Sequence, residues 1–305
     1  MHGARMTPHA LYGIAAGLAA GALWGLVFVV PRMLANFGMV DIAASRFVVF
    51  GAMSALALMA RPARQRWPTG RQAGAALGLS LLGFTGYYVL LAFAVDAIGT
   101  AVPSLVIGAI PVLMMLLGRP AGLQLKTVGL GLALTGAGIA LMVVSAWPEG
   151  GTGGSRFWLG LLLAVLALAS WTVFGLLNAA WLQRHPEVAA TDWANWLGVA
   201  SGMGGLLLWL VAGTSLAGIH AQPNVMWFWL IALVSGVGSS WLATVLWNVA
   251  SQRLSASLCG QLIVSETLFA LLYAFMWDGR WPHATEWAAA VLFVLGILAS
   301  IRAHR

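Results

Sequence analysis

Residues 10–30 read ALYGIAAGLAAGALWGLVFVV, and this stretch contains no charged side chain. A helix needs about 20 apolar residues to cross the hydrocarbon core of a bilayer, and this stretch has that length. Its glycines Gly13, Gly17, Gly21 and Gly25 recur every four residues. They leave one strip of the helix without side chains, which indicates tight packing against another helix or a hinge. We therefore interpret residues 10–30 as a transmembrane helix.

Nine further apolar runs follow along the chain. They lie near residues 39–60, 73–95, 99–118, 125–146, 157–182, 193–213, 226–250, 255–276 and 285–302. The composition agrees with this interpretation, because 61% of the residues are hydrophobic and only 8% are charged, against about 25% in soluble domains. The sequence predicts an all-α polytopic membrane protein with ten transmembrane helices.

The distribution of basic residues predicts the orientation of these helices. With the N-terminus in the cytoplasm, eleven of the 15 Arg and Lys residues fall on the cytoplasmic side, three on the other side, and Arg46 inside the second span. Such a bias follows the positive-inside rule. It also explains the formal charge of +7 without nucleic acid as a partner. We expect a bacterial-type inner membrane protein with both termini in the cytoplasm. The first apolar run is too long for a cleavable signal peptide.

The two halves of the chain show weak similarity to each other. AGALW at 20–24 resembles ALASW at 167–171, and IGTAV at 98–102 resembles LSASL at 254–258. Residues 1–146 are thus interpreted as one five-helix repeat and residues 157–305 as a second. The glycine-rich segment 147–156 is the expected periplasmic linker. Because five is odd, the repeats insert with opposite orientations, as in many secondary transporters. The alternative is chance similarity between helices rich in Ala, Gly and Leu.

Glu266 is the acidic residue expected near mid-depth of the membrane, about twelve residues into the ninth span. An ionised carboxylate there costs at least about 2.5 kcal/mol, and such residues usually line a cavity or pathway. Glu266 is either a proton-coupling or amine-binding group, or a structural carboxyl bonded to Gln261 or Ser265. The spacing of Gln261, Ser265 and Glu266 places them on one broad helix face.

Two other residues interrupt apolar spans. Arg46 lies about two turns into the second span. It either reaches outward to headgroups, pairs with Asp41, or binds a substrate carboxylate. Pro111 lacks a backbone donor and leaves a carbonyl free near Ile107, which predicts a kink in the fourth span.

Most of the sixteen tryptophans fall near span ends, where indole rings anchor at the interface. Trp24, Trp171 and Trp241 lie near mid-span and are candidates for substrate contact, with packing as the alternative. The candidate cavity residues on the third and eighth spans are Tyr87, Tyr88, Ser239 and Asn248.

These residues carry a family resemblance. Two five-helix halves, Trp24 in the first span, Arg46 in the second and the stretch from Ser255 to Glu266 resemble the drug/metabolite transporter superfamily. Within it the chain is similar to EamA-type exporters and to YddG-like aromatic amino acid exporters. The family often has Glu-Pro late in the ninth span, whereas this chain has Glu266 followed by Thr267.

No motif for catalysis, metal binding or ATP binding is found in the sequence. The six histidines lie in termini or loops, Cys259 is the single cysteine, and there is no P-loop. We therefore expect no cofactor and no metal, and a small-molecule substrate and the lipid bilayer as partners. A monomer is plausible. The sequence predicts a secondary transporter that exports amino acids, aromatic ones among them, or related metabolites by alternating access. A multidrug exporter, a passive channel and a membrane-embedded lipid-modifying enzyme are the alternatives.

Overall fold

A computed structural model describes residues 7–62, 67–98, 101–120, 124–146, 155–279 and 281–304. Throughout these ranges the regular elements are helices. The expected linker 147–156 lies outside the described residues apart from its last two positions, where α10 begins.

The helices follow the predicted spans closely. They are α1 (Pro8–Gly25), α2 (Val30–Met33), α3 (Met39–Met59), α5 (Gly70–Ser80), α6 (Gly86–Ile98), α7 (Ala101–Ile107), α8 (Ile110–Leu117), α9 (Leu125–Ala146), α10 (Ser155–Arg184), α11 (Ala190–Ala212), α12 (Leu216–His220), α13 (Val225–Ser235), α14 (Ala243–Arg253), α15 (Ala256–Asp278) and α16 (Ala284–Ala303). Three short segments with other helical geometry continue them: η1 (Leu26–Phe28), η2 (Leu81–Thr85) and η3 (Gly236–Leu242).

Each predicted span coincides with one helix or with consecutive helices. Within the described ranges, eight helices are long and apolar enough to cross a membrane, and Val128–Met142 of α9 is a shorter apolar helix. The predicted fourth span is divided into α7 and α8 at residues 108–109. Pro111 is buried in the first turn of α8, where its missing N–H has no helical partner to lose. The all-helical membrane fold is confirmed, and the chain breaks beside Pro111 as predicted.

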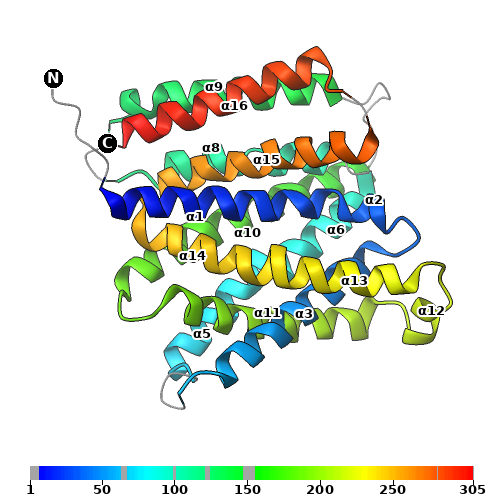
Figure 1. Cartoon of the computed structure of the whole chain (residues 1–305). Coiled ribbons are helices and arrows are strands. Elements are labelled where there is room, and N and C mark those ends of the chain that lie inside the picture. The colour runs from blue at the N-terminus through cyan, green and yellow to red at the C-terminus, as the bar shows by residue number, and fades with distance from the viewer. Residues whose placement is uncertain are drawn as a thin grey trace.

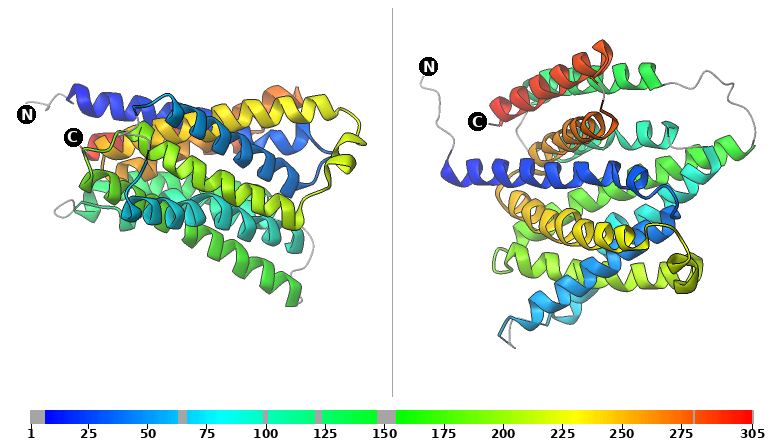
Figure 2. Two further views of the ribbon diagram at one scale, coloured as in Figure 1. Left: turned by 90° about the horizontal axis from the view of Figure 1, so that it is seen from below. Right: turned by 45° about the vertical axis from the view of Figure 1, so that its right-hand side comes forward.

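The helices run roughly along one axis and form a bundle (Figures 1 and 2). The pair α9 and α16 lies at one edge, with α8 and α15 between this pair and the rest of the bundle (Figure 1). The start of α1 and the end of α16 lie at the same end of the bundle. That common end places the predicted first and tenth spans in antiparallel directions, as an even number of crossings requires.

The contacts between helices come in matched pairs. The predicted second span, α3, packs on the seventh, α11. The fifth span, α9, packs on the tenth, α16. The first span meets the eighth through α1 and α14, and the sixth meets the third through α10 and α6. Both the third and the eighth span also contain a π-helical segment, η2 and η3.

Glycines bring several helices into close contact. A Cβ atom on Gly21 would clash with the Ser265 hydroxyl, and one on Gly25 would approach the backbone of α15. The glycine strip predicted on residues 10–30 therefore packs mainly against α15. At the crossing of α3 and α11, Gly51 and Gly202 meet through their backbones. Small residues at such contacts let membrane helices approach closely.

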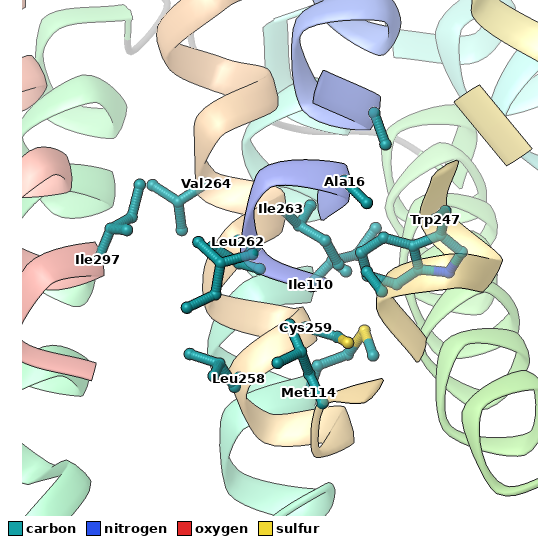
Figure 3. Close-up of a cluster of buried hydrophobic side chains, with 14 of the residues drawn as sticks. Ala16, Ile110, Met114, Trp247, Leu258, Cys259, Leu262, Ile263, Val264 and Ile297 are labelled. Carbon is teal, nitrogen blue, oxygen red and sulfur yellow. The ribbon is translucent and has the colours of Figure 1, made fainter. Parts of the chain in front are cut away.

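The largest buried cluster joins α1, α8, α14, α15 and α16 (Figure 3). Met114 of α8, Trp247 of α14 and Leu262 of α15 are among its fully buried members. A second cluster surrounds Trp193 on α11, and a third surrounds Phe228 on α13. The charged and polar residues of interest lie between or beside these clusters.

Candidate functional site

Arg46 of α3 and Glu266 of α15 are opposite charges inside the bundle. Both lie deep among protein atoms, yet both keep part of their side-chain surface accessible, as expected of residues that line a cavity. Their charges lie close enough to attract each other. Within the described part of the chain, neither side chain has a direct hydrogen-bond or ion-pair partner. An unpaired charge at this depth is costly, and such residues usually line a cavity or pathway.

Of the three interpretations that the sequence leaves open for Arg46, the pair with Asp41 is wrong. Asp41 instead accepts two hydrogen bonds of 2.7 Å from Thr214, one from its backbone N–H and one from its hydroxyl. These bonds connect α3 with the segment after α11, and they give each oxygen of the carboxylate a hydrogen-bond donor. The Arg46 guanidinium lies 4.9 Å from the centre of the Phe47 ring, in cation–π geometry. Its donors are therefore free to bind an anion.

Two tyrosines of α6 stand near the same charges. Tyr87 lies within electrostatic range of both Glu266 and Arg46. Tyr88 donates a hydrogen bond of 2.9 Å from its hydroxyl to the Met39 carbonyl at the start of α3, so its polar atom is already engaged. Of the two predicted tyrosines, Tyr87 is the one that faces both charged groups.

Three tryptophans form one cluster in the interior of the bundle. Trp24 of α1 and Trp171 of α10 meet edge to face, with ring centres 6.2 Å apart. Trp247 of α14 lies 5.4 Å from Trp24 and 6.2 Å from Trp171. Trp24 and Trp171 keep accessible surface, whereas Trp247 is 1% exposed. We name Trp24, Trp171 and Trp247 the tryptophan cluster.

Aromatic contacts continue from the tryptophan cluster to Arg46. Trp171 contacts Phe174 at 5.8 Å, and Phe174 contacts Phe84 at 5.4 Å between ring centres. Phe84 in turn meets Phe47 at 6.3 Å, the ring that lies under Arg46. A continuous line of aromatic rings thus runs from the first span to the guanidinium.

The chain is similar to a known protein family, to a known protein and to a solved structure. Residues 11–144 match the EamA-like transporter family. The chain carries an EamA-like transporter domain. It is also 28% identical over 311 residues to inner membrane protein YtfF of Escherichia coli (strain K12), covering 95% of each chain. A crystal structure of another protein has the same fold, with a TM-score of 0.73, 18% identity, and 96% of this chain and 98% of that chain covered.

The EamA-like domain supplies Trp24, Arg46 and Tyr87, and the second half of the chain supplies Trp171, Trp247 and Glu266. The residues described above thus come from both parts of the chain. Among the described residues, no group of three His, Cys, Asp or Glu side chains is placed to hold a metal ion.

Trp247 is the residue of this transporter that sequence reasoning missed. Trp241, which was predicted instead, donates its indole N–H to the Asn195 side chain at 2.8 Å and lies on the side of η3 that faces α11. The two tryptophans are six residues apart across the end of a π-helical segment. Trp241 was predicted from its position near mid-span, and depth alone does not give the side of the helix on which a residue lies.

Gln261 does not share a face with Glu266. Its amide group donates to Thr135 at 3.0 Å and accepts from Ser300 at 3.0 Å, toward α9 and α16. Ser265 is 2% exposed under Gly21, and its hydroxyl bonds the Leu262 carbonyl at 2.6 Å. The alternative in which Glu266 is a structural carboxyl bonded to Gln261 or Ser265 is therefore wrong, because other groups already satisfy both residues.

Gln261→Leu should lower stability without changing what the transporter carries. The substitution leaves the Thr135 and Ser300 hydroxyls without their buried partner, which costs about 1–3 kcal/mol for each group left unsatisfied. We expect a lower melting temperature in detergent and unchanged relative affinities for competing substrates. A changed order of substrate preference would contradict this structural role.

The remaining predicted residues lie away from the charged pair. Asn248 is fully buried and accepts a hydrogen bond of 3.0 Å from Asn178 through its carbonyl oxygen. Ser239 lines a separate pocket of about 390 Å³ beside Tyr273, between α13, α15 and the end of the first span. Pro111 packs in α8 against the core and supplies no polar atom to the site.

Proposed function

We propose that this transporter exports amino acids, aromatic ones among them, across the inner membrane. The single observation that carries the proposal is the pair Arg46 and Glu266, opposite charges without protein partners on two sides of one interior site. A free amino acid carries a carboxylate and an ammonium group on the same carbon. Arg46 is suited to the carboxylate because a guanidinium binds it with two parallel hydrogen bonds. Glu266 is suited to the ammonium group.

The aromatic surroundings support a preference for aromatic side chains. Trp24 and Trp171 keep accessible surface, and a line of aromatic rings joins Trp171 to Arg46. An aromatic substrate ring gains about 0.5–1.5 kcal/mol from such a contact beyond its burial. The resemblance to YddG-like exporters points to the same substrate class.

The mechanism we propose is alternating access between two inverted five-helix halves. The paired contacts of α3 with α11 and of α9 with α16, and the π-helical segments in both the third and eighth spans, support the internal repeat. Ion pairs join the halves at both ends of the bundle: Arg61 to Asp192 at 3.0 Å, and Arg156 to Asp96 at 3.2 Å. Rocking one half against the other breaks one of these pairs at a time.

We place both termini in the cytoplasm, on the bias of the basic residues and the common end of α1 and α16. The relative YtfF is named an inner membrane protein, which supports the same location. Labelling of single introduced cysteines at the two termini tests this orientation. Termini on opposite sides would contradict the arrangement of inverted halves.

A multidrug exporter is the second candidate, because Glu266 and the tryptophan cluster also suit a lipophilic cation. Arg46 separates the two, since a guanidinium at the site disfavours a substrate that carries only positive charge. Counterflow in proteoliposomes tests the choice: vesicles loaded with unlabelled tryptophan should accelerate uptake of labelled tryptophan, and loading with tetraphenylphosphonium should not. The reverse result would favour multidrug export, and absence of any accelerated exchange would favour a channel.

A further inference from the structure

Four polar atoms on one face of α14 have no hydrogen-bond partner in the described protein. They are the Thr244 hydroxyl, the Trp247 indole N–H, the Asn248 amide nitrogen and the Ser251 hydroxyl. Each of these residues is at most 1% exposed. Their positions i, i+3, i+4 and i+7 place them on one side of the helix. We name these four residues the α14 stripe.

The Ser251 hydroxyl lies near the Cys259 thiol but makes no hydrogen bond of normal geometry with it. A thiol is in any case a weak partner. Asn248 uses its carbonyl oxygen for Asn178, so only its amide nitrogen is left over. The α14 stripe is therefore a row of unused donors and hydroxyls, spaced about one helical turn apart.

Burial of these four polar groups without any hydrogen-bond partner would cost too much free energy. A buried polar group without a partner costs about 1–3 kcal/mol, so four cost about 4–12 kcal/mol together. That sum is comparable to the whole stability of a typical domain, which is about 5–15 kcal/mol. Buried polar groups without protein partners are commonly satisfied by ordered water.

The α14 stripe has a solvent-facing pocket at one end. A pocket of about 250 Å³ lies where α1 begins and α14 ends, and its lining includes His9, Gln183 and Gln252. Gln183 separates the pocket from the stripe, because its amide donates to the Ser251 carbonyl at 3.1 Å and to the Leu254 carbonyl at 3.0 Å. Gln252 donates to the Val188 carbonyl at 2.9 Å. Two amide groups with fixed partners thus stand at this end of the stripe.

The α14 stripe meets the proposed substrate site at Trp247, which lies four residues before its Ser251 end. Trp247 is a member of both the stripe and the tryptophan cluster, where it contacts Trp24 and Trp171. The stripe therefore connects the interior site with the pocket at the end of α14.

We propose that a file of ordered water follows the α14 stripe and forms the closed half of the transport path, on the side where α1 begins. The role of the water file in transport rests on the proposed function, whereas the presence of the water rests on the α14 stripe alone. Gln183 and Gln252 are its gate. Opening of the gate connects the file with the pocket, and the same hydroxyl and amide groups that bind water in the closed state then contact the hydrated substrate.

Radiolytic labelling of the full-length protein tests the water file. Short X-ray pulses generate hydroxyl radicals from bound water, and mass spectrometry reads the oxidation of each tryptophan. Trp193 is a matched control inside the chain, because it is 0% exposed and its indole N–H donates to Asn178 at 2.8 Å. We expect Trp247 to be oxidised at least about fivefold faster than Trp193, since only Trp247 has a free N–H for water. Equal slow rates would overturn the proposal.

The double variant Thr244→Val with Ser251→Ala removes two of the groups that hold the water. It should bring the oxidation rate of Trp247 down to that of Trp193. Ser54→Ala is the control, because Ser54 also has a buried unpartnered hydroxyl but lies at the crossing of α3 and α11. An unchanged Trp247 rate in the double variant would overturn the water file. Tryptophan counterflow is measured on the same wild-type preparation: its absence would overturn the proposed function, whatever the labelling shows.

Discussion

Arg46→Gln should raise the inhibition constant of unlabelled tryptophan, measured against counterflow of labelled tryptophan, about 10–100-fold. The reason is that a charged hydrogen bond contributes about 1.5–3 kcal/mol. Inhibition by tryptamine, which has the same ring and amine but no carboxylate, should change little.

Glu266→Gln should affect the other analogue class. It should weaken inhibition by tryptophan and by tryptamine, which carry the amine, and leave inhibition by indole-3-propionate, which lacks the amine, unchanged. The measurement is the inhibition constant of each compound in proteoliposomes.

Arg156→Gln is the matched control for Arg46→Gln. Arg156 is an exposed arginine whose partner, Asp96, is exposed as well, with 72% and 77% of the side chains accessible. Exposed ion pairs contribute about 0–1 kcal/mol, so all three inhibition constants should stay within about fivefold of wild type. Equal loss for all three compounds in Arg46→Gln would contradict recognition of the carboxylate and indicate a structural role for this arginine.

Gly51→Ala should destabilise the protein strongly. The added Cβ atom would lie 2.6 Å from the Gly202 Cα, and a backbone atom cannot move aside without separating α3 from α11. Overpacking of this kind costs about 1–3 kcal/mol. We expect the melting temperature in detergent to fall by several degrees and the yield of folded protein to fall with it.

Gly74→Ala is the control for Gly51→Ala. Gly74 lies inside α5, and a Cβ there meets nothing within 4 Å. The substitution removes the helix penalty of glycine, so its effect should be neutral or stabilising by up to about 1 kcal/mol. If the two variants melted at the same temperature, the contact between Gly51 and Gly202 would not limit how closely α3 and α11 pack.

The positions of the helices follow from the sequence because the bilayer imposes them. Every backbone N–H and C=O in hydrocarbon must be satisfied within its own segment, so each long apolar run becomes a helix. The stretch from residue 10 to residue 30 therefore predicted α1, and the same rule predicted where α3, α11, α15 and α16 lie. Pro111 likewise predicted the break before α8, because a missing N–H is a local property of the chain.

The partners of the interior side chains did not follow from the sequence. A membrane helix is apolar on all sides, so the periodicity that orients a helix in a soluble protein gives no direction here. That is why the sequence groups Gln261 with Glu266 although Gln261 binds Thr135 and Ser300, and why depth favours Trp241 although Trp247 packs on Trp24. A pair of Arg46 with Asp41 is one of three interpretations that the sequence leaves open, and in the structure the Asp41 carboxylate binds Thr214 instead.

By itself the sequence determined that this chain is a bundle of membrane helices and that Arg46 and Glu266 stand at unusual depth. Only the tertiary structure showed that these two charges lie within electrostatic range of each other and that Trp247 packs on Trp24 and Trp171. The physical reason is that insertion into lipid depends on the summed polarity of each segment. Contacts between segments depend on the shape of side chains that are almost all apolar, and shape is expressed only when the helices pack.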